Sequence, residues 1–354
     1  EFIQILSKAC YEAGAARVYP EYVDEVLVAQ QLRYGGMSQA EYPAYEMDFL
    51  LDKFRDNGCY IRIHSPLPDI FKGIPQEVLN AYSLSKMNAR KNMQDIVGAF
   101  QSTWVIAMYA NPLWARQVYP ELPQDQALDR LWKDLFTFTD VITGDPVKGQ
   151  ENLIKRCHKR VEMLNKAAFR KLIYKSSTCD LEIELPEGHL WNGGAEIAGN
   201  GLRCMANIPT EEVYTVPVKY GVNGWVRNTK PLIHEGVLID DFELVFKEGK
   251  VVQHKAGVGQ AHLEAILEAD EGSRYLGEVA LVSVDSPISA ANRVYYTTLL
   301  DENAPCHLAL GDSFPIALPA DAPEEIKGQL NKSAKHVDFM IGSADLDIIG
   351  VTKE

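Results

Sequence analysis

The chain has 354 residues, which is long enough for two domains or one large domain with a real core. Apolar residues make up 46% of it and charged residues 24%, as in an ordinary soluble enzyme. The formal net charge of −14 disfavours nucleic acid as a partner, because phosphate binding needs a basic surface. No apolar run reaches the roughly 18 residues of a membrane span, and no secretory signal is visible, so we expect no membrane association.

The six cysteines are scattered and include no CxxC pair. Sparse thiols in a long chain favour a reducing cytoplasm over a disulfide framework. The chain begins without methionine inside a segment with a helical pattern, so residue 1 is treated as an arbitrary start.

Helical and strand-like patterns alternate in the first half of the chain. This alternation predicts an α/β domain with a parallel sheet over residues 1–168. The predicted helices are 2–14, 39–56, 75–98, 124–138 and 146–168, and the predicted strands are ARVYPEY (16–22), CYIRIHS (59–65) and TWVIAMY (103–109).

From Lys171 onward apolar residues recur at every second position. This period predicts an antiparallel, β-rich α+β domain over 169–354, interrupted by a helix near 261–270. Two-residue pairs that end in glycine predict the turns of this domain. The predicted strands lie within 173–188, 215–229, 237–256 and 277–284, and the predicted turns are Gly193-Gly194, Asn200-Gly201, Asn223-Gly224 and Glu248-Gly249.

The sequence HVDFMIGS contains a short motif that is suited to metal binding. Residues two apart on a strand point to the same face, so His336 and Asp338 would grip one ion together. The alternative is a surface strand with its polar residues outward. The flanking apolar residues favour a buried strand, where an unpaired aspartate is costly.

Two glutamates occur beside other predicted strands. Glu278 interrupts the apolar LGEVALV, where a carboxylate needs a cation, a donor or a raised pKa, unless the strand lies at a sheet edge. Glu212 follows a Pro-Thr turn and is a weak candidate by itself.

Glu302 and His307 flank the segment Asn-Ala-Pro-Cys. Pro305 is predicted to open a short helix with His307 on its face, and the alternative for His307 is a core histidine. Cys306 next to His307 is an improbable nucleophile–base pair, because adjacent residues of a regular element point in different directions. Together with Glu212, Glu278, His336 and Asp338, these two residues have the composition of a site for two divalent metals.

Other histidines and the glycine-rich segments are weaker candidates. The histidines at 64, 158, 189, 234, 254 and 262 lack neighbours at coordinating spacing, so we expect surface or structural roles. NGGAEIAGNG (192–201) and AGVGQAH (256–262) both miss the phosphate-loop patterns, which disfavours a nucleotide site.

Several segments together resemble the thermophilic-type metallo-aminopeptidases, the aminopeptidase T, aminopeptidase S and PepS family. They occur in the family's order and cover most of the chain, with the strongest match from residue 180 onward. The matching stretches are PLWARQVYPELP, LPEGHLWNGG, NIPTEEVYTVPVKYGVNGWV, TKPLIHEGVLIDDFELVFKEGKVV, GEVALV, YTTLLDENAPCHLALG and HVDFMIGS.

The resemblance implies a two-metal exopeptidase that removes N-terminal amino acids from short peptides. It implies two divalent ions per chain (Zn, Co, Mn or Mg), a homodimer, an enclosed cavity, and a chain that continues beyond residue 354. It implies that Glu212 is both a ligand and the first candidate for the general base, with Glu302 the weakest ligand. The implied ligand set is Glu212, Glu278, Glu302, His307, His336 and Asp338.

One position departs from the family. The resemblance places a catalytic tyrosine seven residues after His307, where this chain has Phe314. A phenylalanine cannot donate to a developing oxyanion, and losing one such donor costs about 10²–10³ in rate. Tyr295, Tyr296 or a metal ion are the candidates to compensate. The alternatives are therefore a slow or non-catalytic relative, or a metallohydrolase acting on another amide or ester, or on a phosphoester.

Overall fold

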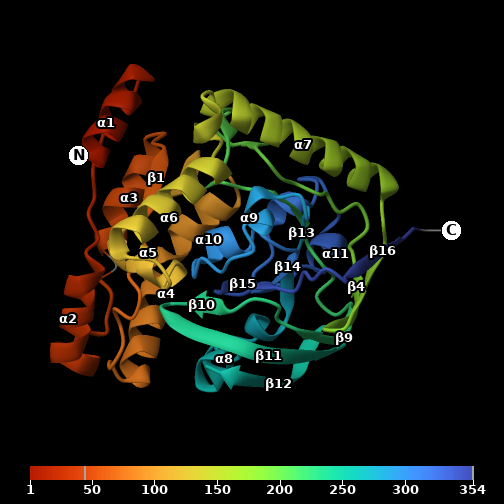
Figure 1. The fold of residues 1–354 in the computed structure, drawn as a ribbon. Helices are drawn as coiled ribbons and strands as arrows, with labels where there is room; N and C mark the ends of the chain where they lie inside the picture. Colours follow the sequence, from red (N-terminus) through yellow and green to blue (C-terminus); the bar gives the residue numbers. More distant parts are fainter. Residues whose placement is uncertain (44, 353–354) are drawn as a thin grey trace.

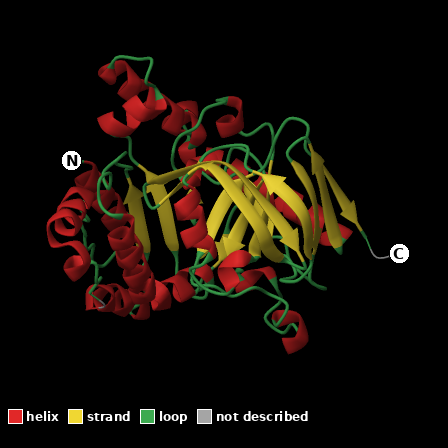
Figure 2. Cartoon of the chain, turned by 90° about the horizontal axis from the view of Figure 1, so that it is seen from below, coloured by secondary structure: helices red, strands yellow, loops and turns green. Residues whose placement is uncertain are grey.

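The computed structural model describes residues 1–43 and 45–352. Helices gather at the N-terminal side, and the antiparallel sheets and the C-terminus lie on the other side (Figure 1). Figure 2 shows the same division from below, with the helices beside a small sheet and the larger sheets beyond it. The predicted combination of a parallel α/β layer with a β-rich antiparallel part is confirmed.

The small sheet is parallel, in the order β1-β2-β7. β1 (Tyr60–His64) and β2 (Trp104–Met108) pair directly along their length, and both were predicted. The third strand, β7 (Asn207–Ile208), comes from far along the chain and pairs with β2. This strand crosses the division predicted at residue 168, and that division stays a prediction.

The helices around this sheet begin at residues that suit helix starts. Asn111 accepts hydrogen bonds from the amides of Leu113 and Trp114 and caps α5, whose first residue is proline. The segment 16–22, predicted as a strand, forms none; Pro20 within it has no amide hydrogen to pair with a neighbouring strand. The helices are α1 (Phe2–Glu12), α2 (Glu25–Gly35), α3 (Tyr45–Arg55), α4 (Gln76–Gly98), α5 (Pro112–Val118), α6 (Gln124–Phe138) and α7 (Pro146–Ala167), with 3₁₀ turns at η1 (Gly36–Gln39) and η2 (Val141–Thr143).

A seven-stranded antiparallel sheet forms the far side of the molecule, in the order β10-β11-β9-β4-β3-β16 with β12 also on β11. Glu248 and Gly249, with φ of 49° and 80°, make the predicted two-residue turn between β11 and β12. The strands are β3 (Lys171–Ser176), β4 (Cys179–Glu184), β9 (Val222–Arg227), β10 (Leu232–His234), β11 (Val237–Lys247), β12 (Lys250–Val258) and β16 (Asp347–Val351).

The turn predicted at Asn223-Gly224 is wrong, because both residues lie inside β9. Gly224 has φ of 121°, and a Cβ there would lie 2.1 Å from the carbonyl oxygen of Asp180 on β4. Glycine is therefore required for close strand approach, which a turn pattern in one sequence does not distinguish.

A four-stranded antiparallel sheet, in the order β15-β14-β13-β8, lies inside the molecule. Its strands are β8 (Glu212–Thr215), β13 (Leu276–Val282), β14 (His307–Gly311) and β15 (His336–Met340). One face packs on the seven-stranded sheet and forms the main core, with the rings of Phe339 and Phe242 5.7 Å apart. The other face is available for polar side chains.

Shorter elements complete the described chain. The predicted helix near 261–270 is confirmed as α8. These elements are β5 (Glu196–Ile197), β6 (Arg203–Cys204), α8 (Gln260–Leu267), η3 (Gly272–Arg274), α9 (Pro287–Ala290), α10 (Thr298–Asp301), η4 (Pro315–Ala317) and α11 (Glu324–Lys327).

Candidate metal centre

The register of the four-stranded sheet gathers polar side chains on the face opposite the main core. Directly opposed residues of an antiparallel pair point to the same face, and so do residues two apart on one strand. Glu278 on β13 is opposite Ala309, which is opposite Asp338 on β15. The residues between them, such as Val279 and Leu308, are buried in the main core.

Residues of β8 and β14 point to the same face of the sheet as Glu278. Glu212 on β8 is opposite Val282, and Tyr214 is opposite Ala280, which is opposite His307 on β14. Strands of alternating polar and apolar residues therefore carry acidic and imidazole groups to one surface of the sheet.

A first group of possible ligands consists of Glu212, Glu278 and His307. The Nε2 atom of His307 lies 2.9 Å from Oε2 of Glu212 and 3.7 Å from Oε1 of Glu278. The exposed fractions of the His307 and Glu278 side chains are only 1% and 5%, so water screens these charges poorly.

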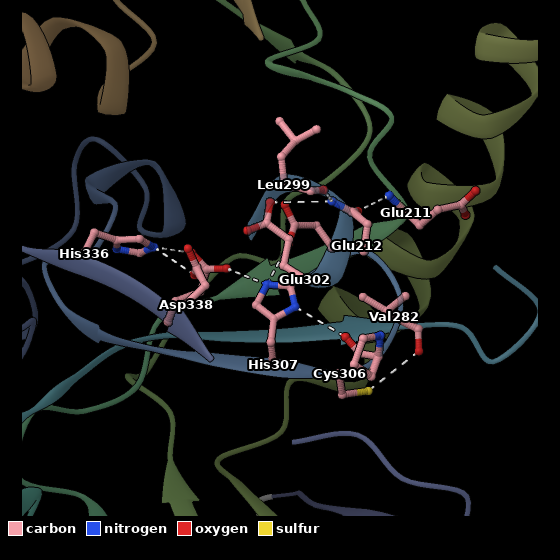
Figure 3. Close-up of polar contacts among 12 residues, drawn as sticks. Glu211, Glu212, Val282, Leu299, Glu302, Cys306, His307, His336 and Asp338 are labelled. Carbon is pink, nitrogen blue, oxygen red and sulfur yellow. Dashed lines mark hydrogen bonds and ion pairs between the residues drawn. The ribbon is translucent and has the colours of Figure 1, made fainter. Parts of the chain in front are cut away.

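A second group consists of Glu278, His336 and Asp338. Nε2 of His336 lies 3.4 Å from Oε2 of Glu278 and 3.3 Å from Oδ1 of Asp338. In Figure 3 the side chains of His336, Asp338 and His307 point toward one another from β15 and β14. Glu278 is common to both groups and offers one oxygen to each.

Both imidazoles are oriented by backbone carbonyls. Nδ1 of His336 lies 2.8 Å from the carbonyl oxygen of Asp312, and Nδ1 of His307 lies 3.4 Å from that of Pro305. With Nδ1–H donating to a carbonyl, Nε2 faces the carboxylates; it donates to them while the imidazole is protonated and offers its lone pair to a metal ion that displaces that proton. Metal-binding histidines are held in this way.

Glu302 reaches the same region from another element. It directly follows α10 as its C-terminal cap and is only 7% exposed, and Nδ2 of Asn303 lies 3.5 Å from its Oε1. Glu302 belongs to neither three-residue group of possible ligands. The helix predicted to open at Pro305 is wrong, because His307 begins β14 and the local helix ends before it.

Glu278 and the His336–Asp338 pair occupy different positions in the four-stranded sheet. Glu278 is not on an edge strand, since β13 lies between β14 and β8. His336 and Asp338 lie on one face of a strand, as predicted, and β15 is the edge strand of the four.

The electrostatics indicate an excess of buried negative charge. Burial, and then the charges of Asp338 and Glu212, raise the pKa of Glu302 well above its usual value. Burial alone would lower the pKa of His307, but hydrogen bonds to Glu212 and Glu278 outweigh it and raise this pKa well above its ordinary value. These shifts arise because carboxylates are close together with little water, an arrangement that favours a cation between them.

The two adjacent glutamates of the PTEEVYT segment have different partners. Glu211 lies with Oε1 3.9 Å from Arg156, while Glu212 contacts His307 (Figure 3). Asn303 accepts from the amide of Glu211 at 2.6 Å and so positions this segment. Nothing in the single sequence distinguishes Asn303.

The thiol of Cys306 is directed away from the histidine beside it. Its Sγ lies 3.6 Å from the carbonyl oxygen of Val282, and burial raises its pKa (Figure 3). This geometry agrees with the expectation that Cys306 is no nucleophile.

Phe314 borders the centre. Its ring lies 4.6 Å, centroid to centroid, from His336 and 5.9 Å from Tyr214. Tyr295, one of the expected substitutes for the missing phenol, is fully buried and donates to Asp134 at 2.8 Å in a separate core cluster. The compensating tyrosine predicted at 295 is therefore engaged elsewhere.

Comparison with known proteins shows the family to which the chain belongs. The family model described as thermophilic metalloprotease (M29) matches residues 1–354. Aminopeptidase 2 of Geobacillus stearothermophilus is 38% identical over 99% of this chain and 86% of its own length. Aminopeptidase AmpS of Bacillus subtilis is 36% identical over 100% of this chain and 88% of its own length.

A solved structure, wild-type AmpT from Thermus thermophilus, matches with a TM-score of 0.91 and 34% identity. The match covers 99% of this chain and 87% of that one. The fold and these relatives thus define a metal-dependent hydrolase. The chain belongs to the thermophilic metalloprotease family M29, and the expected membership in a family of metallo-aminopeptidases is confirmed.

Proposed function

We propose that this chain is a metal-dependent aminopeptidase with a dinuclear site. Glu212, Glu278 and His307 hold one divalent ion, while Glu278, His336 and Asp338 hold the other. Glu302 supplies the sixth side chain. The observation that carries this proposal is that Glu278 directs its two oxygens toward two separate histidines, at 3.7 and 3.4 Å.

The donor chemistry fits two divalent ions. Four carboxylates and two imidazoles suit Zn²⁺, Co²⁺, Mn²⁺ or Mg²⁺, and a shared carboxylate can bridge a pair. Glu278, Glu302 and His307 are at most 7% exposed, so the carboxylates need cationic partners that solvent does not provide.

When bound, two such ions would polarise the scissile carbonyl, lower the pKa of a shared water and engage the free α-amine of the substrate. Glu212 is the candidate to accept the proton of that water and pass it to the leaving amine. Its side chain is 13% exposed, against 5% for Glu278, so it is the more accessible of the two. His307 orients Glu212 through the 2.9 Å contact.

The proposed substrates are short peptides with a free N-terminus. We further propose that the active site is enclosed, that the protein is a homodimer and that it acts in the cytoplasm. None of the helices in the described part of the chain is long and apolar enough to span a membrane. Two other functions remain: a metallohydrolase for another amide or an ester, and a slow relative limited by Phe314.

Hydrolysis of aminoacyl-p-nitroanilides distinguishes an aminopeptidase from these two alternatives. We expect the purified chain to release p-nitroaniline, to lose this activity in a chelator and to regain it with Zn²⁺, Co²⁺, Mn²⁺ or Mg²⁺. The matched N-acetylated compounds should be inert, since they lack the α-amine. Equal hydrolysis of acetylated and free compounds would favour a general amidase, and no hydrolysis with any cation would overturn the proposal.

Metal analysis tests the site independently of rate. About two ions per chain are expected at this centre, and fewer in Glu278→Gln and His336→Ala. Glu243→Gln, which removes a carboxylate on β11 that pairs with Arg227, is the control and should keep them. If both site variants retain both ions and activity, the assignment is wrong.

A further inference from the structure

A second cluster of possible ligands lies outside the dinuclear centre and shares no residue with it. It consists of His234, Glu235 and His262, whose nearest ligand atoms all lie within 4.8 Å of one another. These histidines lack ligand spacing in the sequence, and only the fold brings them together.

Local backbone structure explains how Glu235 and His234 enter the cluster. Glu235 and Gly236 have φ of 51° and 76° and form a two-residue turn between β10 and β11. A glutamate in the left-handed region is strained by about 1 kcal/mol or more, so tertiary contacts must hold it there. A Cβ on Gly236 would lie 3.2 Å from the ring of Phe71, which places the turn against the N-terminal part.

The two imidazoles approach each other as ligands of one ion do. Nδ1 of His234 lies 3.0 Å from Nε2 of His262. Two nitrogens at about 2.0–2.1 Å from a tetrahedral zinc are separated by about 3.3 Å, so a shift of a few tenths of an ångström admits the metal. His262 is 5% exposed and comes from the first turn of α8.

Neighbouring side chains form hydrogen bonds to two of the three proposed ligands, His262 and Glu235. Nε2 of the Gln76 side-chain amide, at the start of α4, lies 3.1 Å from Nδ1 of His262. With this amide turned over, its oxygen accepts Nδ1–H and the Nε2 lone pair of His262 is left for the metal. Glu235 is bound by Nζ of Lys335 at 3.3 Å and by the hydroxyl of Ser83. Such outer contacts fix ring orientation and carboxylate position in metal sites.

The protonation state also suits a metal. Burial lowers the pKa of His234 to about 4 and lowers that of His262. Both rings are therefore neutral near pH 7, and each has a lone pair to offer. Glu235 remains ionised: burial raises its pKa, but the charge of Lys335, that of His234 when this ring is protonated at acid pH, and the hydrogen bond from Ser83 outweigh burial and lower it.

We propose that His234, Glu235 and His262 form a mononuclear site for a divalent transition-metal ion such as Zn²⁺, with water as the fourth ligand. The ion ties the β10–β11 turn to α8, beside Gln76 and Ser83 of α4. Hydrogen bonds from Gln76 and Ser83 to the ligands connect this site to α4. Without the ion, one imidazole simply donates a hydrogen bond to the other.

Zinc stoichiometry of the full chain tests this site. The protein is stripped with a chelator and equilibrated with Zn²⁺, and bound metal is measured by mass spectrometry. We expect His234→Gln/His262→Gln to bind one ion fewer than the wild-type chain. In a Glu278→Gln/Asp338→Asn background one ion should remain, and the two histidine substitutions should then remove it.

The zinc stoichiometry tests this site whether or not the dinuclear centre binds metal. If the dinuclear centre binds nothing, the wild-type chain keeps one ion and the histidine double variant keeps none. Glu235→Gln alters only the partly exposed turn and should weaken zinc binding at this site at least about 10-fold. His254→Gln removes a nearby histidine that contacts Gln260 and should change nothing. Equal zinc content in the wild-type chain and the histidine double variant would overturn the proposal.

Discussion

The ring of Phe314 lies against the imidazole of His336, with centroids 4.6 Å apart and planes tilted by 43°. A Cβ added to Gly98, at the end of α4, would lie 3.5 Å from the same ring. The N-terminal helices and the metal-binding face thus meet at one apolar side chain, where the resemblance to the family implies a phenol.

Phe314→Tyr is expected to raise kcat, by up to about 10²-fold, with little change in KM. The added hydroxyl would supply a donor to developing negative charge, and one such donor is worth about 10²–10³ in rate. Steady-state kinetics on an aminoacyl-p-nitroanilide, at saturating metal, measure the effect.

Phe314→Leu is the matched control, since it adds no donor and removes the ring from His336; it should not gain rate. An unchanged kcat in Phe314→Tyr, with wild-type metal content, would mean that a phenol at this position does not limit the reaction.

Tyr214 is the phenol that shares the metal-binding face. It lies two residues after Glu212 on β8, opposite Ala280, and its ring meets Phe314 edge-on at 5.9 Å. We expect Tyr214→Phe to lower kcat, and the gain from Phe314→Tyr to be larger in that background than in the wild-type chain. Kinetics of the four proteins form a double-mutant cycle, and gains that are equal within about 0.5 kcal/mol would mean that the two positions act independently.

Glu278→Gln is expected to weaken the binding of both metal ions, whereas Asp338→Asn should weaken mainly the binding of the ion near His336. The reason is that Glu278 alone belongs to both ligand groups. The loss in affinity should exceed the 10–100-fold typical of removing an outer contact. Metal titration of stripped protein measures it. Glu211→Gln, whose carboxylate faces Arg156, serves as the control and should keep both ions.

Local patterns predicted much of the secondary structure. Helix α6 has its bounds where the apolar period placed them, and the period of two located most of the antiparallel strands. Errors occur where tertiary contacts decide the outcome. The close approach of β4 made Gly224 a strand residue, and pairing with β15 and β13 drew His307 into a strand.

The six acidic and imidazole residues were predicted as a set through family resemblance, because sequence spacing links only His336 with Asp338. The register of β13 and β14 is what makes Glu278 common to two groups, and register is a property of strand pairing. His234 and His262 lie 28 residues apart, and only the folded chain brings their nitrogens to 3.0 Å. Asn303 acts through a hydrogen bond to the Glu211 amide, which leaves no mark on a single sequence.

The His234–His262 pair also predicts how stability depends on pH when a chelator is present. In the unfolded chain a histidine gains its proton near pH 6.5, but burial lowers the pKa of His234 to about 4 in the folded chain. Between these values the unfolded state binds more protons, so the free energy of unfolding falls as pH falls, by at most about 1.4 kcal/mol per pH unit for this group. The groups that face His234 are His262, Glu235 and Lys335. Urea unfolding at pH 7, 6 and 5 should therefore show a steeper loss for the wild-type chain than for His234→Gln, and parallel losses would contradict the proposed neutral, buried state of His234.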